Sequence, residues 1–183
     1  MPLLAATPVP DDFEMRTNAT FEALMWALSR PGTVQTLPFP GMAGIAEALL
    51  DRECRVFCDD PALGDQIAPF GALPVPLPLA DHAFLSLAGS EALERVAQVQ
   101  VGSDLYPDEG ATVVAPASFG AGQRLRLTGP GIEGATEIAI DGLAPGFWSL
   151  RAARCRYPAG FELFLISGAE VIGLPRSTMI EVL

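Results

Sequence analysis

The order of the predicted elements favours a single α/β domain over residues 1–183, with three layers (α/β/α) around a mixed sheet. Strand-like and helix-like segments alternate in the first half of the chain, and strand-like segments cluster in the second half. The length of 183 residues suits one domain, and 50% of the residues are hydrophobic. The mean hydropathy of +0.33 predicts a large core or a surface that partner chains cover.

The first half of the chain predicts helices and strands in alternation. Apolar residues between Phe21 and Leu28 recur at helical spacing, in a helix that begins between Asp11 and Asn18. Pro31 ends this helix, because proline disfavours helical geometry at the residue before it. The further expected segments are an extended piece at 33–37, a helix at 44–51, strands at 54–58 and 82–87, and a helix at 90–98 with Ser90 as N-cap.

The second half predicts mostly strands that are separated by glycine-rich turns. Alternation of polar and apolar residues with period two is typical of a strand, and arginines near the end of a helix favour its dipole. The expected segments are strands at 111–117 and 123–129 joined by a turn at 118–122, a strand at 135–140, a helix at 146–158, and a terminal hairpin of 161–168 and 170–182.

The chain is acidic, and all of its basic residues are arginines. Twenty-two acidic side chains outnumber 11 arginines, for a net charge of −11, which argues against binding to nucleic acid or to an anionic membrane. The excess of acids lies in residues 1–120, whereas residues 121–183 hold six arginines and six acids. An anion site is therefore expected among the arginines of the second part, with Arg30 as the main exception.

A membrane span and a secretion signal are not expected. Prolines interrupt the longest uncharged run, residues 66–80, so that this run cannot form a spanning helix. The N-terminus lacks the basic region that precedes the apolar segment of a signal peptide. We therefore expect a cytoplasmic location, and the odd number of three cysteines fits a reducing compartment.

The sequence GPGIEG at 129–134 follows the pattern of a dinucleotide-binding loop. Such a loop requires a helix directly after its glycines, so that backbone N–H groups meet the pyrophosphate. Residues 135–140 alternate as a strand instead, so we favour a tight turn over a dinucleotide-dependent oxidoreductase. Before this turn Arg124, Arg126 and Thr128 share one strand face, which forms either a solvated surface or a clamp for phosphate or phosphonate.

No catalytic residue and no metal site are expected. The one histidine, His82, follows Asp81 in a chain without the G-x-S-x-G sequence that positions a serine nucleophile, so a strand-edge role is favoured. One histidine and no C-x-x-C pair are too few ligands for a conventional zinc site. The acid pairs at 59–60 and 108–109 adjoin prolines or glycine in turns, where we expect them in solvent.

Four segments occur in an order that resembles one known family. They are FEALMWALSRPGTV at 21–34, YPDEGATVV at 106–114, LRLTGPGI at 125–132 and YPAGFELFLISGAEVIGLPRSTMIEV at 157–182. Together they resemble the PhnH subunits of the bacterial carbon–phosphorus lyase system. The resemblance extends over nearly the whole chain, although residues 39–97 contribute little to it.

The resemblance implies a fold, a set of partners and a reaction. The implied fold is similar to that of pyridoxal-phosphate-dependent transferases, and the implied assembly is a homodimer in a core complex with the PhnG, PhnI and PhnJ subunits. That complex attaches an alkylphosphonate to the ribose C1 of ATP and displaces adenine. Pyridoxal phosphate needs a lysine for its Schiff base, and this chain has no lysine, so no cofactor is expected.

These observations leave two main hypotheses of function. The first is an accessory, non-catalytic subunit of the phosphonate-processing complex, and the second is a stand-alone protein or enzyme that binds phosphate or phosphonate at its arginines. In either case the arginines and glycines form an anion site, or they pair with surface acids and shape the backbone. The candidate site residues are Arg30, Arg124, Arg126, Gly129, Gly131, Arg176 and Thr178.

Overall fold

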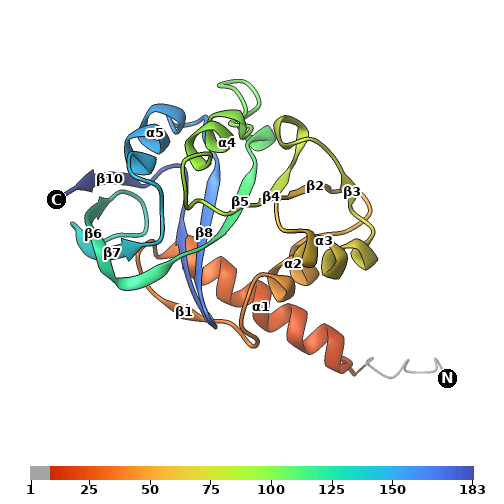
Figure 1. The fold of residues 1–183 in the computed structure, drawn as a ribbon. Coiled ribbons are helices and arrows are strands. Elements are labelled where there is room, and N and C mark those ends of the chain that lie inside the picture. Colours follow the sequence, from red (N-terminus) through yellow and green to blue (C-terminus); the bar gives the residue numbers. More distant parts are fainter. Residues whose placement is uncertain (1–8) are drawn as a thin grey trace.

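A seven-stranded mixed sheet forms the centre of the molecule in a computed structural model that describes residues 9–183 (Figure 1). Five strands run parallel, and two further strands add an antiparallel edge. The predicted α/β class with a mixed sheet is confirmed. In spatial order the strands are β1 (Gln35–Thr36), β9 (Glu170–Leu174), β8 (Glu162–Ser167), β5 (Thr112–Pro116), β4 (His82–Phe84), β2 (Arg55–Cys58) and β3 (Leu73–Pro74).

Three helices cover one face of this sheet: α1 (Asp12–Ser29), α2 (Ala43–Leu49) and α3 (Pro61–Ile67). Helix α1 begins within the predicted interval, where Asp11 and Glu14 form a reciprocal capping box. It ends before Pro31, as the sequence predicts. Its buried stripe, which includes Leu24 and Ala27, packs on the strands together with side chains from α2 and α3.

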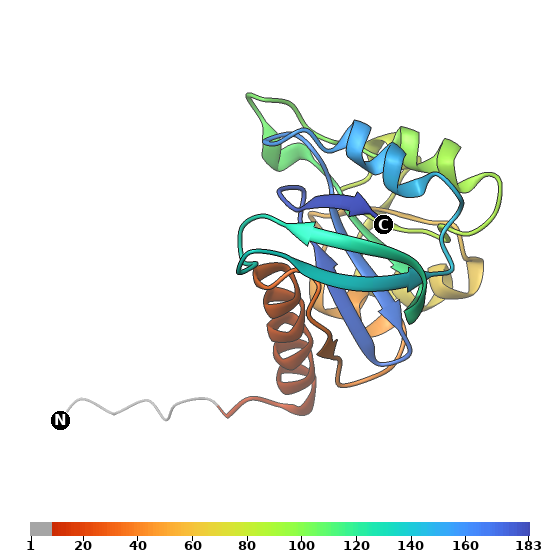
Figure 2. The same cartoon turned by 90° about the vertical axis from the view of Figure 1, so that its left-hand side faces the viewer.

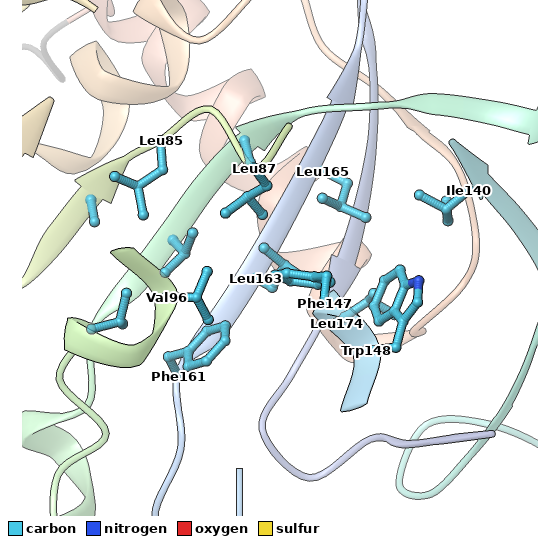
Figure 3. Packing of buried hydrophobic residues seen from close by; sticks show 14 of the residues in the cluster. Leu85, Leu87, Val96, Ile140, Phe147, Trp148, Phe161, Leu163, Leu165 and Leu174 are labelled. Atoms are coloured by element: carbon cyan, nitrogen blue, oxygen red, sulfur yellow. The ribbon is translucent and has the colours of Figure 1, made fainter. Parts of the chain in front are cut away.

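The opposite face is covered by helices α4 (Ala92–Gln98) and α5 (Phe147–Arg154) and by a second, three-stranded sheet. Figure 3 shows Phe147 and Trp148 of α5 against leucines of the strands below. The two aromatic rings meet edge to face, with centroids 4.9 Å apart. This larger core fixes α5, and with it the arginines of its last turn, Arg151 and Arg154.

The second sheet is antiparallel and consists of β10 (Met179–Val182), β6 (Ser118–Thr128) and β7 (Thr136–Asp141). Figure 2 shows its three strands side by side in front of the large sheet. Leu125 and Leu127 of β6 point into the core and are fully buried, whereas Arg124 and Arg126 are exposed. The predicted division of β6 into an apolar face and a polar face is therefore confirmed.

The second sheet corrects three expectations about the later strands. The segment 170–182 is not one strand, because Pro175 has no N–H to donate and the chain leaves β9 there to enter β10 of the other sheet. The segment 118–122 is not a separate turn, since it belongs to β6, with an irregular register between Phe119 and Gln123. The two expected strands 111–117 and 123–129 also lie in different sheets.

Other differences fall in the middle of the chain. Helix α3 was not predicted; Asp60 caps it by accepting from the N–H of Ala62, and Pro61 occupies its first turn. Helix α4 begins two residues later than expected, without a side-chain cap from Ser90. In residues 9–183, no helix combines the length and the apolar character that crossing a membrane requires.

Candidate functional site

Two of the segments quoted above, 106–114 and 157–182, meet at Arg176, in the connection between β9 and β10. The backbone N–H of Arg176 donates to Oε2 of Glu162 at 2.9 Å, and its Nε donates to Oε1 of the same residue at 2.5 Å. Its NH1 donates to the carbonyl oxygen of Pro107. A Cβ at Gly110 would lie 2.9 Å from this NH1 and 2.2 Å from the carbonyl oxygen of Gly160, so only glycine fits there.

The Arg151 side chain of α5 also contacts the connection between β9 and β10. Its NH2 donates to the carbonyl oxygens of Leu174 at 3.1 Å and Pro175 at 2.8 Å, and its NH1 donates to that of Thr178 at 3.4 Å. A crossing between two sheets leaves carbonyl groups without ladder partners, and a guanidinium can supply several donors to them. Arg151 is only 2% exposed, and its charge lies 5.9 Å from the ring centre of Phe161.

Two adjacent cavities flank this connection, and Tyr157, Arg176 and Ser177 line both of them. The inner cavity has a volume of about 270 Å³. Its lining consists of Trp148, Arg151, Ala152, Cys155, Tyr157, Arg176, Ser177, Thr178, Met179 and Ile180. The outer cavity, of about 350 Å³, is lined by Pro107, Asp108, Tyr157, Pro158, Glu162, Pro175, Arg176 and Ser177.

Two buried polar atoms in the lining residues of the inner cavity have no hydrogen-bond partner within the described chain. They are Nε of Arg151 and Oγ1 of Thr178. Burial lowers the pKa of the Arg151 guanidinium, and nearby Cys155 and Glu162 oppose that effect. Orphaned buried donors are uncommon in folded proteins. The other two unpartnered atoms of the described chain, Nδ1 of His82 and Nε of Arg154, belong to residues that line neither cavity, so the inner cavity is the one of the two whose lining residues carry unpartnered buried atoms.

The structure separates the predicted arginines into different environments. Arg176 and Thr178 line the inner cavity. Arg124 pairs with Glu137 of β7 at 2.7 Å, in a well-exposed ion pair. Arg126 lines a hollow of about 610 Å³ on the outer face of the small sheet, to which Glu181 of the neighbouring strand also contributes. Contact of Arg124 or Arg126 with an anion stays a prediction.

The glycine turn after β6 packs against the turn after α1. A Cβ at Gly131 would lie 2.2 Å from the carbonyl oxygen of Ser29, and a Cβ at Gly129 would lie 3.0 Å from that of Ser177. The backbone of the turn therefore touches both the end of α1 and the β9–β10 connection. The Arg30 side chain lies instead over the ring of Trp26, with its guanidinium carbon 4.8 Å from the ring centre.

A strand follows the glycine turn, which excludes the dinucleotide-binding loop. Residues Thr136–Asp141 form β7, and it pairs with β6 in antiparallel register. No helix therefore begins directly after these glycines at 135–141, and the pattern GPGIEG serves a tight turn between strands, as the sequence predicts.

Comparisons with known proteins identify the family. Residues 11–181 match the family described as bacterial phosphonate metabolism protein (PhnH). A relative in Stutzerimonas stutzeri, named putative C-P lyase subunit protein HtxG, is 36% identical over 172 residues, covering 91% of this chain and 86% of the relative. A second, in Rhizobium meliloti (strain 1021), is 31% identical over 180 residues, covering 90% of each chain. The second is named alpha-D-ribose 1-methylphosphonate 5-triphosphate synthase subunit PhnH.

The chain belongs to the PhnH family. The resemblance drawn from four quoted segments is thereby confirmed, and the match includes residues 39–97, which had contributed little to it.

The other acidic and metal-ligating groups considered in the sequence of this PhnH-family chain show no catalytic or metal-binding arrangement within residues 9–183. Asp81 accepts from the Arg55 guanidinium, and burial lowers the pKa of the adjacent His82. Asp59 corrects an expectation: it lies not in solvent but between the N–H of Ser86, at 2.8 Å, and Arg95, at 2.9 Å. Within residues 9–183 no group of three or more metal-ligating side chains gathers.

Sequence reasoning missed Arg151, the most buried arginine of the site. A signal for it exists, since Arg151 lies three and four residues after Trp148 and Phe147, on the face of α5 that packs into the core. A charged residue on the apolar stripe of a short helix is unusual. The position of the arginines in this segment indicated only a favourable charge near a helix end.

Proposed function

We propose that this chain is a subunit of the carbon–phosphorus lyase complex in phosphonate catabolism. In that role it supports the transfer of an alkylphosphonate to the ribose C1 of a nucleoside triphosphate. The observation behind the proposal is the family match over residues 11–181, together with two relatives named as subunits of such systems. The partners are the PhnG, PhnI and PhnJ subunits and a second copy of the chain, in the cytoplasm.

An apolar surface on α1 supports a role within an assembly. Phe21, Met25 and Trp26 are 47%, 50% and 43% exposed and lie on one stretch of the helix. Large exposed apolar side chains that lie together are typical of surfaces that contact other proteins. We call these three side chains the α1 apolar surface.

The role as an accessory subunit rather than an independent enzyme rests on the chemistry of the side chains. The chain has no lysine for a Schiff base, and Asp81, beside the single histidine, is engaged by Arg55. The proposed likeness to pyridoxal-phosphate-dependent transferases therefore concerns the backbone fold alone.

The proposal is tested by co-expression with tagged PhnI, together with PhnG and PhnJ, and by growth on methylphosphonate. We expect the chain to be captured in stoichiometric amount and to restore growth on methylphosphonate to a strain that lacks its own PhnH-family gene. A chain that stays free of the three subunits and does not restore growth contradicts the proposal.

A pair of matched variants locates the contact. Met25→Asp introduces a charge into the α1 apolar surface. Glu22→Gln alters a neighbouring exposed position of the same helix and introduces no charge into that surface. We expect the first to weaken capture or dimerisation, measured by pull-down and light scattering, and the second to leave both unchanged. Equal effects of the two variants would exclude the α1 apolar surface as the contact.

A further inference from the structure

The inner cavity has a local excess of positive charge. Arg151 and Arg176 line it, and no carboxylate of the described chain does so. Glu162 in the outer cavity pairs with Arg176, so the two guanidiniums share one close counter-charge. Asp108 lines the outer cavity only, and it is exposed. Because a buried charge without a counter-ion is costly, an anion in the inner cavity would lower the free energy of the site.

The two unpartnered atoms are suited to an oxyanion. The Nε of Arg151 is a donor only, and the hydroxyl of Thr178 can donate. The other nitrogens of Arg151 are already engaged with backbone carbonyls, so its fork is held in a fixed orientation. Donors that are fixed before binding lose little entropy when an acceptor arrives.

The size of the inner cavity limits the ligand. About 270 Å³ is below the usual range of pockets for drug-sized ligands, about 300–1,000 Å³, so a small anion fits better than a whole nucleotide. The Nε of Arg151 and the Oγ1 of Thr178 are closed to water. Tyr157 and Met179 line the cavity and are 76% and 71% exposed, so the cavity lies at the surface, where an anion can reach it from solvent.

From these contacts we propose that the inner cavity binds one small phosphorus oxyanion, an alkylphosphonate or a phosphate group, through Arg151, Arg176 and the Thr178 hydroxyl. The choice of phosphorus as the central atom rests on the proposed function, whereas the choice of an anion rests on the cavity itself. Arg151 contributes a buried charge in a fixed position, and Arg176 connects the anion to Glu162 and to the outer cavity.

The test is calorimetric titration of the full-length chain with methylphosphonate, inorganic phosphate and sulfate at low salt, repeated by ³¹P NMR for the two phosphorus compounds. We expect methylphosphonate or phosphate to bind more tightly than sulfate. If methylphosphonate binds more tightly than phosphate, the bound oxyanion is that of an alkylphosphonate. If phosphate binds more tightly, the bound oxyanion is the phosphate group of a phosphate ester. No binding of any of the three at millimolar concentration overturns the proposal, as does equal binding of all three.

Variants locate the site. Thr178→Val keeps the shape of the side chain and removes the hydroxyl, and we expect it to lower affinity about tenfold, the effect of one hydrogen bond to a charged group. Its unfolding midpoint should stay unchanged or rise, because the lost hydroxyl is unpartnered. Arg176→Gln should also weaken binding. Arg124→Gln, on the exposed face of β6, serves as the matched control and should bind like the unaltered chain.

Two results would move the anion elsewhere. Full affinity in Thr178→Val and Arg176→Gln overturns the proposal, and so does loss of affinity in Arg124→Gln alone, which would place the anion on the small sheet. Capture of Thr178→Val by the partner subunits is measured in parallel. Capture without phosphorus binding leaves the subunit role intact, so failure of the site is distinguished from failure of the proposed function.

Discussion

The arginines of β6 and the arginines around the inner cavity have opposite surroundings. Arg124 lies on the outer face of a two-sided strand and pairs with Glu137, and the two side chains are 66% and 52% exposed. Arg151 is buried under the β9–β10 connection and donates to three backbone carbonyls. An exposed ion pair contributes little to stability, whereas a buried donor that satisfies several carbonyls is costly to remove. The comparison shows that burial and partners, rather than residue type, determine what an arginine does.

The largest expected effect tests this comparison directly. Arg151→Met removes the guanidinium donors of three backbone carbonyl oxygens, of which only that of Pro175 is known to keep another donor, the N–H of Thr178. We expect it to lower the free energy of unfolding by about 3 kcal/mol or more. Arg124→Met should change it by less than about 0.5 kcal/mol. Urea denaturation followed by fluorescence of the two tryptophans measures both. Similar values for the two variants would show that the buried contacts of Arg151 add no stability.

The glycine turn connects the two regions, and its glycines offer the second prediction. Gly131 and Gly134 both have positive φ, 81° and 68°, so alanine is strained at either position. Only at Gly131 would the added Cβ meet another atom, the carbonyl oxygen of Ser29 at 2.2 Å. We expect Gly134→Ala to cost about 1 kcal/mol and Gly131→Ala about 2 kcal/mol more, in the range of other steric core substitutions. Equal unfolding midpoints would contradict the close approach of the turns.

A third prediction concerns the carboxylate that the cavities share. Glu162→Gln removes the negative charge opposite Arg176 but keeps the size of the side chain. In this ion pair the side chains of Arg176 and Glu162 are 14% and 21% exposed. We expect a loss of about 1–2 kcal/mol of stability, since hydrogen bonds to charged groups are stronger than neutral ones. Phosphorus-oxyanion affinity should rise in the same variant, because the counter-charge is gone. A fall in affinity measured by calorimetry would indicate that Glu162 positions Arg176 for the ligand.

The smallest effect extends the comparison to a half-buried group that can lose its charge, His82. Burial lowers the pKa of His82 in the folded chain, so between pH 7 and pH 5 the unfolded chain binds the proton more readily. The free energy of unfolding should therefore fall as the pH drops through the unfolded pKa, near 6.5. His82→Gln should remove this part of the slope, because His82 is the only histidine. The measurement is chemical denaturation between pH 5 and 7. If the free energy of unfolding of His82→Gln depends on pH as steeply as that of the unaltered chain, the prediction is wrong.

Local patterns predicted the elements that depend on neighbouring residues. The alternation in β6 determines which side faces the core, because a strand has one fixed period. Arg124 and Arg126 were therefore placed correctly on one face of β6, opposite the buried Leu125 and Leu127. In α1 the spacing predicted the helix but not its buried side, since Leu24 is buried while Phe21 and Met25 of the same predicted stripe are exposed. The stop at Pro31 is equally local, since proline acts on the residue directly before it.

The second sheet and the inner cavity could not be predicted in this way. They depend on the crossing at Pro175, where the chain passes from one sheet to another, and on contacts such as Arg176 with Pro107, 69 residues apart. No local period encodes such a pairing. The sequence suggested that Arg176 and Thr178 belong together, but Arg151 joins them only through the packing of α5.

The contact between the two turns also limits which sequences the fold accepts. At Gly131 the obstacle is a backbone oxygen, so no substitution at position 29 can make room for a side chain. At Gly32 the nearest atoms belong to the side chains of Leu127 and Thr136, at 2.8 and 3.0 Å. In a library that varies the residues of both turns, the folded variants should thus all keep glycine at position 131, whatever residues surround it. Position 32 should instead accept residues that tolerate positive φ, such as asparagine, whenever 127 or 136 becomes smaller.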